Sequence, residues 1–124
     1  MALEGTQLAD FTPVTEVTEL LKIDTVEGTG AEVPAGATVT VHYTGAVAAT
    51  GTIFQSSKDF GDTISFPLSG VIAGWTEGVP GMKIGGTRRL VIPAEKAYGS
   101  RPPFGSGIPA DAALVFDIEL IAIA

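Results

Sequence analysis

The side chains in this sequence that could act on another molecule are mainly aromatic. Those at inward positions of expected strands, on one short helix or beside a long loop are Tyr43, Phe54, Phe66, Trp75, Tyr98 and Phe116. Such a set often forms only the core of a domain. The two phenol hydroxyls, however, need hydrogen-bond partners when they are buried. An apolar bowl with a few polar groups is the usual form of a binding pocket, and we interpret the set in this way.

Residues for covalent or metal chemistry are sparse. His42 is the only histidine and no nucleophile is marked as its partner, so we interpret it as a structural residue rather than a general base. Asp59 and Asp62 lack the spacing of a calcium loop and are interpreted as turn formers. The chain has no cysteine, which excludes disulfides and thiolate chemistry. We therefore expect neither a metal nor a cofactor.

Composition limits the organisation and the partners of the chain. Its 124 residues suffice for one domain, and 14 acidic against 7 basic residues give a net charge of −7, which disfavours nucleic acid or a membrane as partner. No apolar run approaches the ~20 residues of a membrane span. Residues 1–5 contain neither a basic residue nor an apolar segment. We therefore predict a cytoplasmic location, with export after removal of a leader as the alternative, and a monomer as the default state.

One short helix must position the tryptophan. Ile72, Trp75 and Val79 have helical spacing and share one face, and the glycine and proline residues after Glu77 end the helix after about two turns. The alternation typical of β-strands covers residues 17–23, 37–43, 53–54, 64–68, 87–92 and 113–121. The pattern predicts a curved sheet wrapped around Trp75.

Two further segments differ from these elements. Residues 1–15 are aperiodic, and we predict a flexible acidic arm that is only loosely attached to a folded domain of residues 16–124. Residues 99–113 form a long loop rich in glycine and proline, of the kind that is more often functional than not. In the strand that follows this loop, alternate apolar residues from Leu114 to Leu120 are expected to face the core.

Several short motifs stand in the order typical of one protein family. They are VHYTG at 41–45, GTIF at 51–54, VIAGWTEG at 71–78, GGTRRLVIP at 85–93, AYG at 97–99, and IP at 108–109 followed by LVF at 114–116. Over residues 20–120 the chain therefore resembles the FKBP-type (tacrolimus-binding) peptidyl-prolyl cis-trans isomerases. The resemblance implies an α+β fold, in which a half-open antiparallel β-sheet curls around one short α-helix.

The resemblance also implies an activity and its ligands. The activity is rotation of X-Pro amide bonds in unfolded or flexible proteins, which assists protein folding, and macrolides such as tacrolimus or rapamycin are implied as further ligands. Amide resonance sets the barrier to this rotation at ~18–20 kcal/mol, but no bond is broken, so no nucleophile, metal or cofactor is required. The twisted amide has less charge separation than the planar one, and a dry aromatic cavity therefore favours it. A thousandfold acceleration needs only ~4 kcal/mol.

By position, the resemblance implies a site residue by residue. The proline ring is expected on the indole of Trp75, and the backbone N–H of Ile72 and the hydroxyl of Tyr98 are expected to donate hydrogen bonds to substrate carbonyls. The other expected contacts are Tyr43, Phe54, Val71 and Phe116 in the catalytic pocket, and Gln55, Ile64, Phe66, Phe104 and Ile108 around the substrate.

The sequence departs from the family pattern at three positions. Gln55 stands where the family usually has an aspartate, and Phe60 where it has the arginine partner, so both charges are absent together. Ile64 replaces a second phenylalanine. These changes bear on catalytic rate and macrolide affinity rather than on the fold. The loop around 102–104 is slightly longer than in minimal members but too short for the chaperone insert of some relatives.

Two alternatives remain beside the isomerase. The first is a non-catalytic module that binds proline-containing peptides or macrolides without turning them over, because Gln55 removes a negative group from the pocket. The second is a general holdase, which has less support since the chain has neither an insert domain nor a broad apolar flap. A cis-to-trans peptide assay separates the isomerase from the pure binder.

Overall fold

The computed structural model of the chain describes residue 3 and residues 5–102 and 105–123. Its strands are β1 (Leu21–Val26), β2 (Thr38–Val47), β3 (Ile53–Ser56), β4 (Ile64–Pro67), β5 (Thr87–Ile92) and β6 (Leu114–Ile123). The helical elements are α1 (Ala73–Gly78) and the 3₁₀ turns η1 (Ser57–Asp59), η2 (Leu68–Gly70) and η3 (Ala94–Lys96). None of the helices in this described part is long and apolar enough to cross a membrane.

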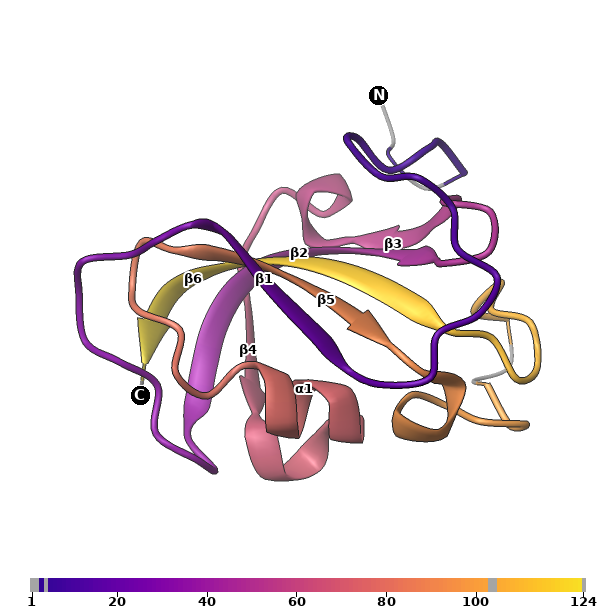
Figure 1. Ribbon diagram of the computed structural model, residues 1–124. Coiled ribbons are helices and arrows are strands. Elements are labelled where there is room, and N and C mark those ends of the chain that lie inside the picture. The colour runs from indigo at the N-terminus through magenta and orange to yellow at the C-terminus, as the bar shows by residue number, and fades with distance from the viewer. Residues whose placement is uncertain (1–2, 4, 103–104, 124) are drawn as a thin grey trace.

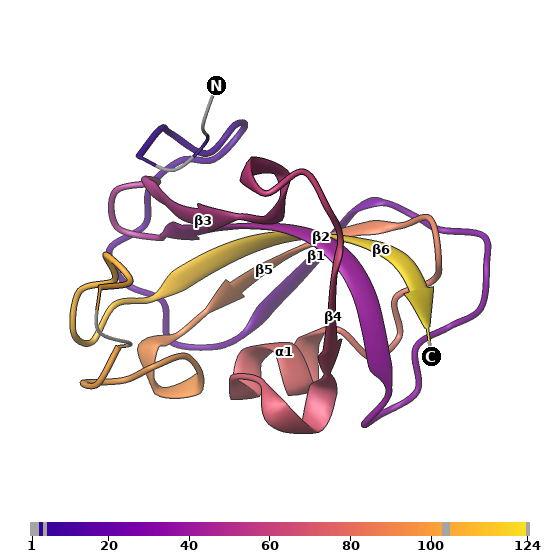
Figure 2. The same cartoon turned by 180° about the vertical axis from the view of Figure 1, so that it is seen from behind.

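The strands form an antiparallel sheet in the order β1-β5-β6-β2-β3, and β4 also pairs with β2. On the edge of β2 that faces away from β6, β4 pairs with its first half and β3 with its second half. Figure 1 shows β2 and β6 bending so that the sheet curls over α1, and Figure 2 shows the same arrangement from behind. The predicted half-open antiparallel sheet around one short helix is confirmed.

The core lies between the curved sheet and α1. The alternate residues of β6 that were expected to face it are all buried: Leu114, Phe116, Ile118 and Leu120. Trp75 of α1 and Val79, the C-cap of this helix, belong to the same buried cluster. The strand period of two residues and the helix period of 3.6 residues therefore supply the two surfaces that pack together.

β5 has the predicted bounds, whereas β2 extends further than predicted, to Val47. The extra part of β2 pairs with β6 on one edge and with β3 on the other, so its backbone is fully used in the sheet. Gly45 lies in this part. A Cβ atom added to it would come within 2.7 Å of the rings of both Phe54 and Phe116, so glycine is required where these two rings meet.

β1 begins at Leu21 rather than at residue 17, and all of its side chains are exposed. It is an edge strand that pairs only with β5 among the described strands, and its register shifts near Thr25. The alternation that predicted a longer strand is therefore present in the sequence but is not used for packing. Propensity alone does not extend a strand whose neighbours cover neither of its faces.

The first residues of the chain do not form the loosely attached arm that the sequence predicted. Backbone hydrogen bonds join the N–H of Leu8 to the carbonyl of Gly51 and the N–H of Val14 to the carbonyl of Ala48, both at 2.8 Å. Leu8 is buried in a second apolar cluster with Ala46, Ile53, Val91 and Val115. The arm therefore covers the outer face of the sheet, and the prediction of loose attachment is wrong for these residues.

Arg89 of β5 holds the N-terminal residues against the sheet through hydrogen bonds. Its Nη1 donates to the carbonyl of Asp10 at 2.7 Å, and its Nε donates to Oδ1 of Asp117 at 2.7 Å. The guanidinium also lies over the ring of Phe11, with Cζ 5.6 Å from the ring centroid. The hydrogen bond to Asp117 raises the pKa of Arg89, although burial opposes the shift, and so favours the charged guanidinium.

Candidate functional site

A cavity of about 460 Å³ lies between α1 and the curled sheet. The residues that line it are Tyr43, Phe54, Gln55, Phe66, Gly70, Val71, Ile72, Trp75, Tyr98 and Phe116. They come from four strands, from η2 and α1, and from the turn after η3, so the curl of the sheet brings distant parts of the sequence together. The volume is typical of a pocket for a small ligand or a few residues of a peptide. None of the described residues that line it carries a formal charge.

Trp75 lies at the centre of this cavity. The rings of Tyr43, Phe66 and Phe116 surround its indole at centroid distances of 5.6, 5.4 and 5.4 Å, with interplanar angles of 80°, 77° and 86°. These are edge-to-face contacts, which orient the rings as well as bury them. Trp75 is only 4% exposed, so neighbouring rings hold the indole in one position while part of it lines the cavity.

Tyr43 and Gln55 form the polar part of the wall. The Tyr43 hydroxyl donates a hydrogen bond of 2.7 Å to Oε1 of Gln55, which comes from the neighbouring strand β3. Burial raises the pKa of Tyr43, and the nearby Tyr98 phenol raises it further, so Tyr43 remains a neutral donor. Gln55 therefore supplies an acceptor for this phenol without adding a negative charge to the cavity.

Two hydrogen-bond donors at the cavity have no acceptor within the described chain. One is the backbone N–H of Ile72, the N-cap of α1, whose carbonyl already accepts from the N–H groups of Trp75 (3.0 Å) and Thr76 (3.2 Å). The other is the hydroxyl of Tyr98, whose residue is 37% exposed. The first turn of any helix leaves such N–H groups unpaired, so these donors can serve a ligand. Their assignment to substrate carbonyls stays a prediction.

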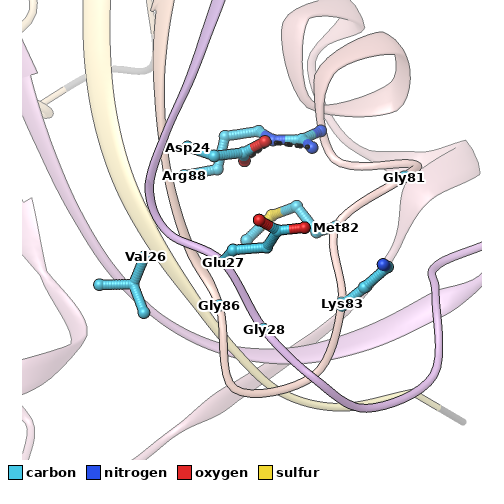
Figure 3. Close-up of a pocket in the computed structure, with 9 residues that line it drawn as sticks. All are labelled: Asp24, Val26, Glu27, Gly28, Gly81, Met82, Lys83, Gly86 and Arg88. Carbon is cyan, nitrogen blue, oxygen red and sulfur yellow. Dashed lines mark hydrogen bonds and ion pairs between the residues drawn. The ribbon is translucent and has the colours of Figure 1, made fainter.

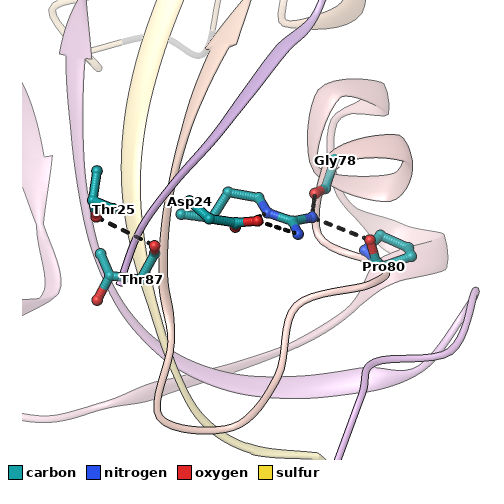
Figure 4. Close-up of polar contacts among 6 residues, drawn as sticks. Asp24, Thr25, Gly78, Pro80 and Thr87 are labelled. Carbon is teal, nitrogen blue, oxygen red and sulfur yellow. Dashed lines mark hydrogen bonds and ion pairs between the residues drawn. The ribbon is translucent and has the colours of Figure 1, made fainter. Parts of the chain in front are cut away.

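The other end of α1 is closed by Arg88 of β5. Its Nη1 donates to the carbonyls of Gly78 at 2.8 Å and Pro80 at 3.2 Å, and its Nε donates to Oδ1 of Asp24 at 2.6 Å (Figure 4). Thr25 Oγ1 donates to the carbonyl of Thr87 on the adjacent part of β1 and β5. The guanidinium thus satisfies carbonyls that the end of a helix leaves without partners. It also joins α1 to two strands.

A small cleft of about 50 Å³ accompanies this contact between β1 and the turn that follows α1 (Figure 3). Asp24 and Arg88 lie at one end of the cleft, and Glu27 and Lys83 line it further along. The cleft has room for little more than ordered water. We assign it a structural role, because Arg88 is only 8% exposed and its guanidinium is already paired with Asp24 and with the end of α1.

The interpretation of His42, Asp59 and Asp62 as structural residues stays a prediction, and each of them makes a hydrogen bond within the chain. His42 Nδ1 is 3.0 Å from Ser57 Oγ. Asp62 Oδ1 accepts from the N–H of Thr63 at 2.8 Å, and Asp59 Oδ1 accepts from the N–H of Leu3 at 2.7 Å. Within the described residues, no group of three or more acidic or histidine side chains is placed to hold a metal ion.

Most of the residues that the sequence predicted for the site line the cavity, and Ile64 and Ile108 do not. Ile64 pairs with Val41 across β4 and β2 and packs against the core, and Ile108 is buried at 9% exposure in the same core cluster. Phe104 lies outside the described residues. Gly70 was not predicted but lines the cavity; its place at the end of η2, directly before the helix, is the signal that could have indicated it.

The comparisons with known proteins agree with this geometry. A model of the FKBP-type peptidyl-prolyl cis-trans isomerase family matches residues 30–121. The chain belongs to this family. It is therefore a peptidyl-prolyl cis-trans isomerase that assists protein folding, and the FKBP family binds proline-containing peptides and FK506-type macrolides.

Individual relatives lead to the same assignment. The chain is 53% identical over 105 residues to a probable FK506-binding protein of Corynebacterium glutamicum, which covers 84% of this chain and 86% of that protein. It is 50% identical over 97 residues to the FKBP-type peptidyl-prolyl cis-trans isomerase FkpA of Aeromonas hydrophila, 77% of this chain but 35% of FkpA. A crystal structure of a peptidyl-prolyl cis-trans isomerase from Pseudomonas syringae matches with a TM-score of 0.75 and 37% identity, over 85% of this chain and 75% of that one.

Gln55 and Phe60, which the resemblance places at the usual positions of a charge pair, differ in their relation to the cavity. Gln55 replaces the usual aspartate but keeps the Tyr43 hydroxyl paired. Phe60, at the usual arginine position, is 65% exposed and does not line the cavity. The charge pair is therefore lost without leaving an unpaired polar group in its place.

Proposed function

We propose that this isomerase catalyses rotation of X-Pro bonds in unfolded or flexible polypeptides by holding the proline ring against Trp75. The observation that supports the proposal is the uncharged cavity of about 460 Å³, with an indole at its base and edge-to-face rings around it. A proline ring is apolar and uncharged, so it packs on this surface without the hydration loss that a charged side chain would suffer. An apolar residue before the proline is the expected preference.

The mechanism rests on a difference between two states of the same amide. Rotation removes the resonance that gives the planar amide its charge separation. The twisted amide therefore loses less hydration free energy than the planar amide when it leaves water for the cavity. The cavity excludes water over its apolar rings and offers fixed donors to the rotated carbonyl. The chain supplies these donors from the N–H of Ile72 and the hydroxyl of Tyr98, whose acceptors the described part of the chain does not provide.

A cis-to-trans peptide assay tests this proposal. The wild type is expected to accelerate isomerisation of a short Ala-Leu-Pro-Phe peptide, measured by NMR exchange between the cis and trans resonances. The nitrogen of an X-Pro amide carries no hydrogen and the rotation transfers no proton, so no solvent isotope effect beyond that of hydrogen bonding is expected. Binding of the peptide with isomerisation left at its background rate would instead support the non-catalytic binding module.

Macrolide ligands, the oligomeric state and the cellular location are separate parts of the proposal. Tacrolimus and rapamycin are expected to compete with the peptide for the cavity, because both need the same apolar surface at Trp75. Competition in the NMR assay tests this expectation, and binding without inhibition contradicts it.

A monomer is expected in gel filtration coupled to light scattering. The cytoplasm, with export as the alternative, stays a prediction that cell fractionation tests.

A further inference from the structure

The cavity around Trp75 is called the proline pocket from here on. A second cavity lies next to it, on the far side of Phe54. It has a volume of about 310 Å³ and is bounded by the turn between β2 and β3, by residues 106–109 of the long loop, and by Gly5 of the N-terminal arm. Phe54 lines this cavity as well as the proline pocket, so one side chain separates the two. We call the second cavity the flanking groove.

Phe54 is held rigidly in this dividing position. Its ring meets the ring of Phe116 edge to face, with centroids 5.7 Å apart and an interplanar angle of 88°. Gly45 leaves the space in which both rings sit, since a Cβ atom there would come within 2.7 Å of each. An extended polypeptide advances about 3.3 Å per residue. A substrate chain that crosses this ring therefore reaches the flanking groove within a few residues of its proline.

The hydroxyl groups in the flanking groove are arranged to donate. Oγ1 of Thr50 accepts from the N–H of Thr52 at 3.2 Å, and Oγ of Ser106 accepts from the N–H of Ile108 at 3.2 Å. Each oxygen is thus occupied as an acceptor by the chain itself, and no bond donated by either hydroxyl is present within the described residues. A hydroxyl keeps one proton to donate, and the natural acceptor in a polypeptide is a backbone carbonyl.

Apart from Thr52, the other described residues that line the flanking groove are apolar or glycine. Val47 and Ile53 are buried at its base, and Pro109 lines its side. No Asp, Glu, Lys or Arg side chain is among the described residues that line it. An ionic ligand would therefore lose hydration without gaining a counter-charge, whereas a neutral stretch of polypeptide gains both apolar contact and hydrogen bonds.

We propose that the flanking groove is a second subsite for the substrate chain, which binds neutral residues adjacent to the X-Pro bond. The proposal rests on the proposed function, because the proline pocket fixes the proline from which the chain continues across Phe54. It predicts that substrate length matters: an X-Pro segment inside an unfolded protein or a long peptide binds more tightly than a tetrapeptide with the same X-Pro sequence.

The test compares short and long substrates on matched variants. The double variant Thr50→Val and Ser106→Ala removes both donors with little change in volume, and Ser106→Trp fills the groove. Thr18→Val, an exposed threonine on another part of the surface, is the control. The substrates are a tetrapeptide and two decapeptides in which the same X-Pro core is extended by neutral residues towards either end.

We expect the wild type to show a lower KM for at least one decapeptide than for the tetrapeptide. The double variant should raise that KM about 3–10-fold, and Ser106→Trp should raise it at least as much, because each lost hydrogen bond weakens binding by a factor of a few. Neither variant should change kcat/KM for the tetrapeptide, and Thr18→Val should change nothing. Isomerisation of the tetrapeptide by the wild type therefore tests the proposed function separately from the second subsite.

Two results would overturn the subsite. One is equal loss of activity on the tetrapeptide and the decapeptides, which would mean that the substitutions disturb the proline pocket rather than a separate groove. The other is an unchanged KM for both decapeptides in both variants. Backbone NMR shifts of Thr52 and Gly107 supply an independent reading: they should move with a decapeptide and not with the tetrapeptide. Movement with tacrolimus alone would assign the groove to macrolides and reject the proposal.

Discussion

The two ends of the helix α1 have opposite characters. At the N-terminal end, Ile72 has no side-chain cap, and its N–H has no acceptor in the described chain, next to an uncharged aromatic cavity. At the C-terminal end, Arg88 donates to two carbonyls and pairs with Asp24. The helix is thus fixed at the end away from the aromatic cavity, and its polar groups are left available at the end where the substrate is expected.

This contrast separates positioning from catalysis. The α-helix has only six residues, too short to be stable by itself, so contacts with the sheet must hold it in place. The guanidinium of Arg88 and the rings around Trp75 make these contacts from opposite ends. We call the C-terminal end of α1, which Arg88 contacts, the closed end, and the N-terminal end beside the cavity the open end. Substitutions at the closed end should mainly lower stability, and substitutions at the open end should mainly lower activity.

The largest effect is expected for Trp75→Ala, at the open end. The variant removes the surface for the proline ring, and kcat/KM should fall at least about 100-fold, which corresponds to ~2.7 kcal/mol of transition-state stabilisation. Loss of a buried tryptophan also destabilises by about 3–5 kcal/mol, so Trp75→Leu should be measured beside it. Isomerisation is followed by NMR exchange and folding by circular dichroism. Wild-type activity in folded Trp75→Leu would contradict the role of the indole.

A large effect on stability is expected for Arg88→Met, at the closed end. The substitution leaves the carbonyls of Gly78 and Pro80 without their donor and should lower the free energy of unfolding by about 2–4 kcal/mol. The matched control is Lys96→Met, which breaks an exposed pair with Glu77 and should cost under ~1 kcal/mol. Urea unfolding measures both. The kcat/KM of the folded Arg88→Met variant should stay within about threefold of wild type; a larger loss would mean that this end also tunes the site.

A smaller effect on activity is expected for Tyr98→Phe. The variant removes one donor from the cavity and keeps the ring, so kcat/KM should fall about 3–10-fold while the free energy of unfolding stays within ~0.5 kcal/mol of wild type. Tyr43→Phe is the comparison, because its hydroxyl is already paired with Gln55. If the two variants lose activity equally, the Tyr98 hydroxyl has no special role towards the substrate.

The strongest periodic patterns in the sequence predicted the elements that build the core. β5 and the inward residues of β6 follow the alternation closely, and the spacing of Ile72, Trp75 and Val79 places the helix correctly. These segments are packed on a face that their own pattern defines, so local sequence and tertiary contact agree. Family motifs then predicted which of these positions meet at the cavity.

The parts that the sequence did not predict depend on contacts between distant segments. Leu8 belongs to no periodic pattern, yet it is buried on the outer face of the sheet. Val91 and Val115 on that face were the available signal, since two apolar side chains opposite the core need a cover. For Ile64 and Ile108 the position in the family motifs suggested the cavity wall. In the structure, Ile108 belongs to the buried core cluster and Ile64 packs against it. Likewise, only the structure identifies Gln55 as the partner of Tyr43.

The smallest predicted effect concerns the dependence of stability on pH at the closed end. The hydrogen bond from Arg88 lowers the pKa of Asp24 below its ordinary value of 3.8, although burial opposes the shift. The ionised carboxylate therefore favours the folded state above about pH 4, and this contribution is lost as the pH falls through the lowered pKa. Because Asp24 is largely exposed, Asp24→Asn should reduce the free energy of unfolding at pH 7 by no more than ~1 kcal/mol.

Urea midpoints of the wild type and Asp24→Asn between pH 7 and pH 2 measure this contribution. The two curves should converge as the pH falls through the lowered pKa of Asp24, because the side chain is then protonated in both the folded and the unfolded wild type. Other carboxylates titrate in both proteins and cancel in the comparison. A difference that stays constant down to pH 2 would show that the Asp24 side chain stabilises β1 by its shape and hydrogen bonding, not by its charge. The hold of Arg88 on α1 through the carbonyls of Gly78 and Pro80 would then not depend on the charge of Asp24.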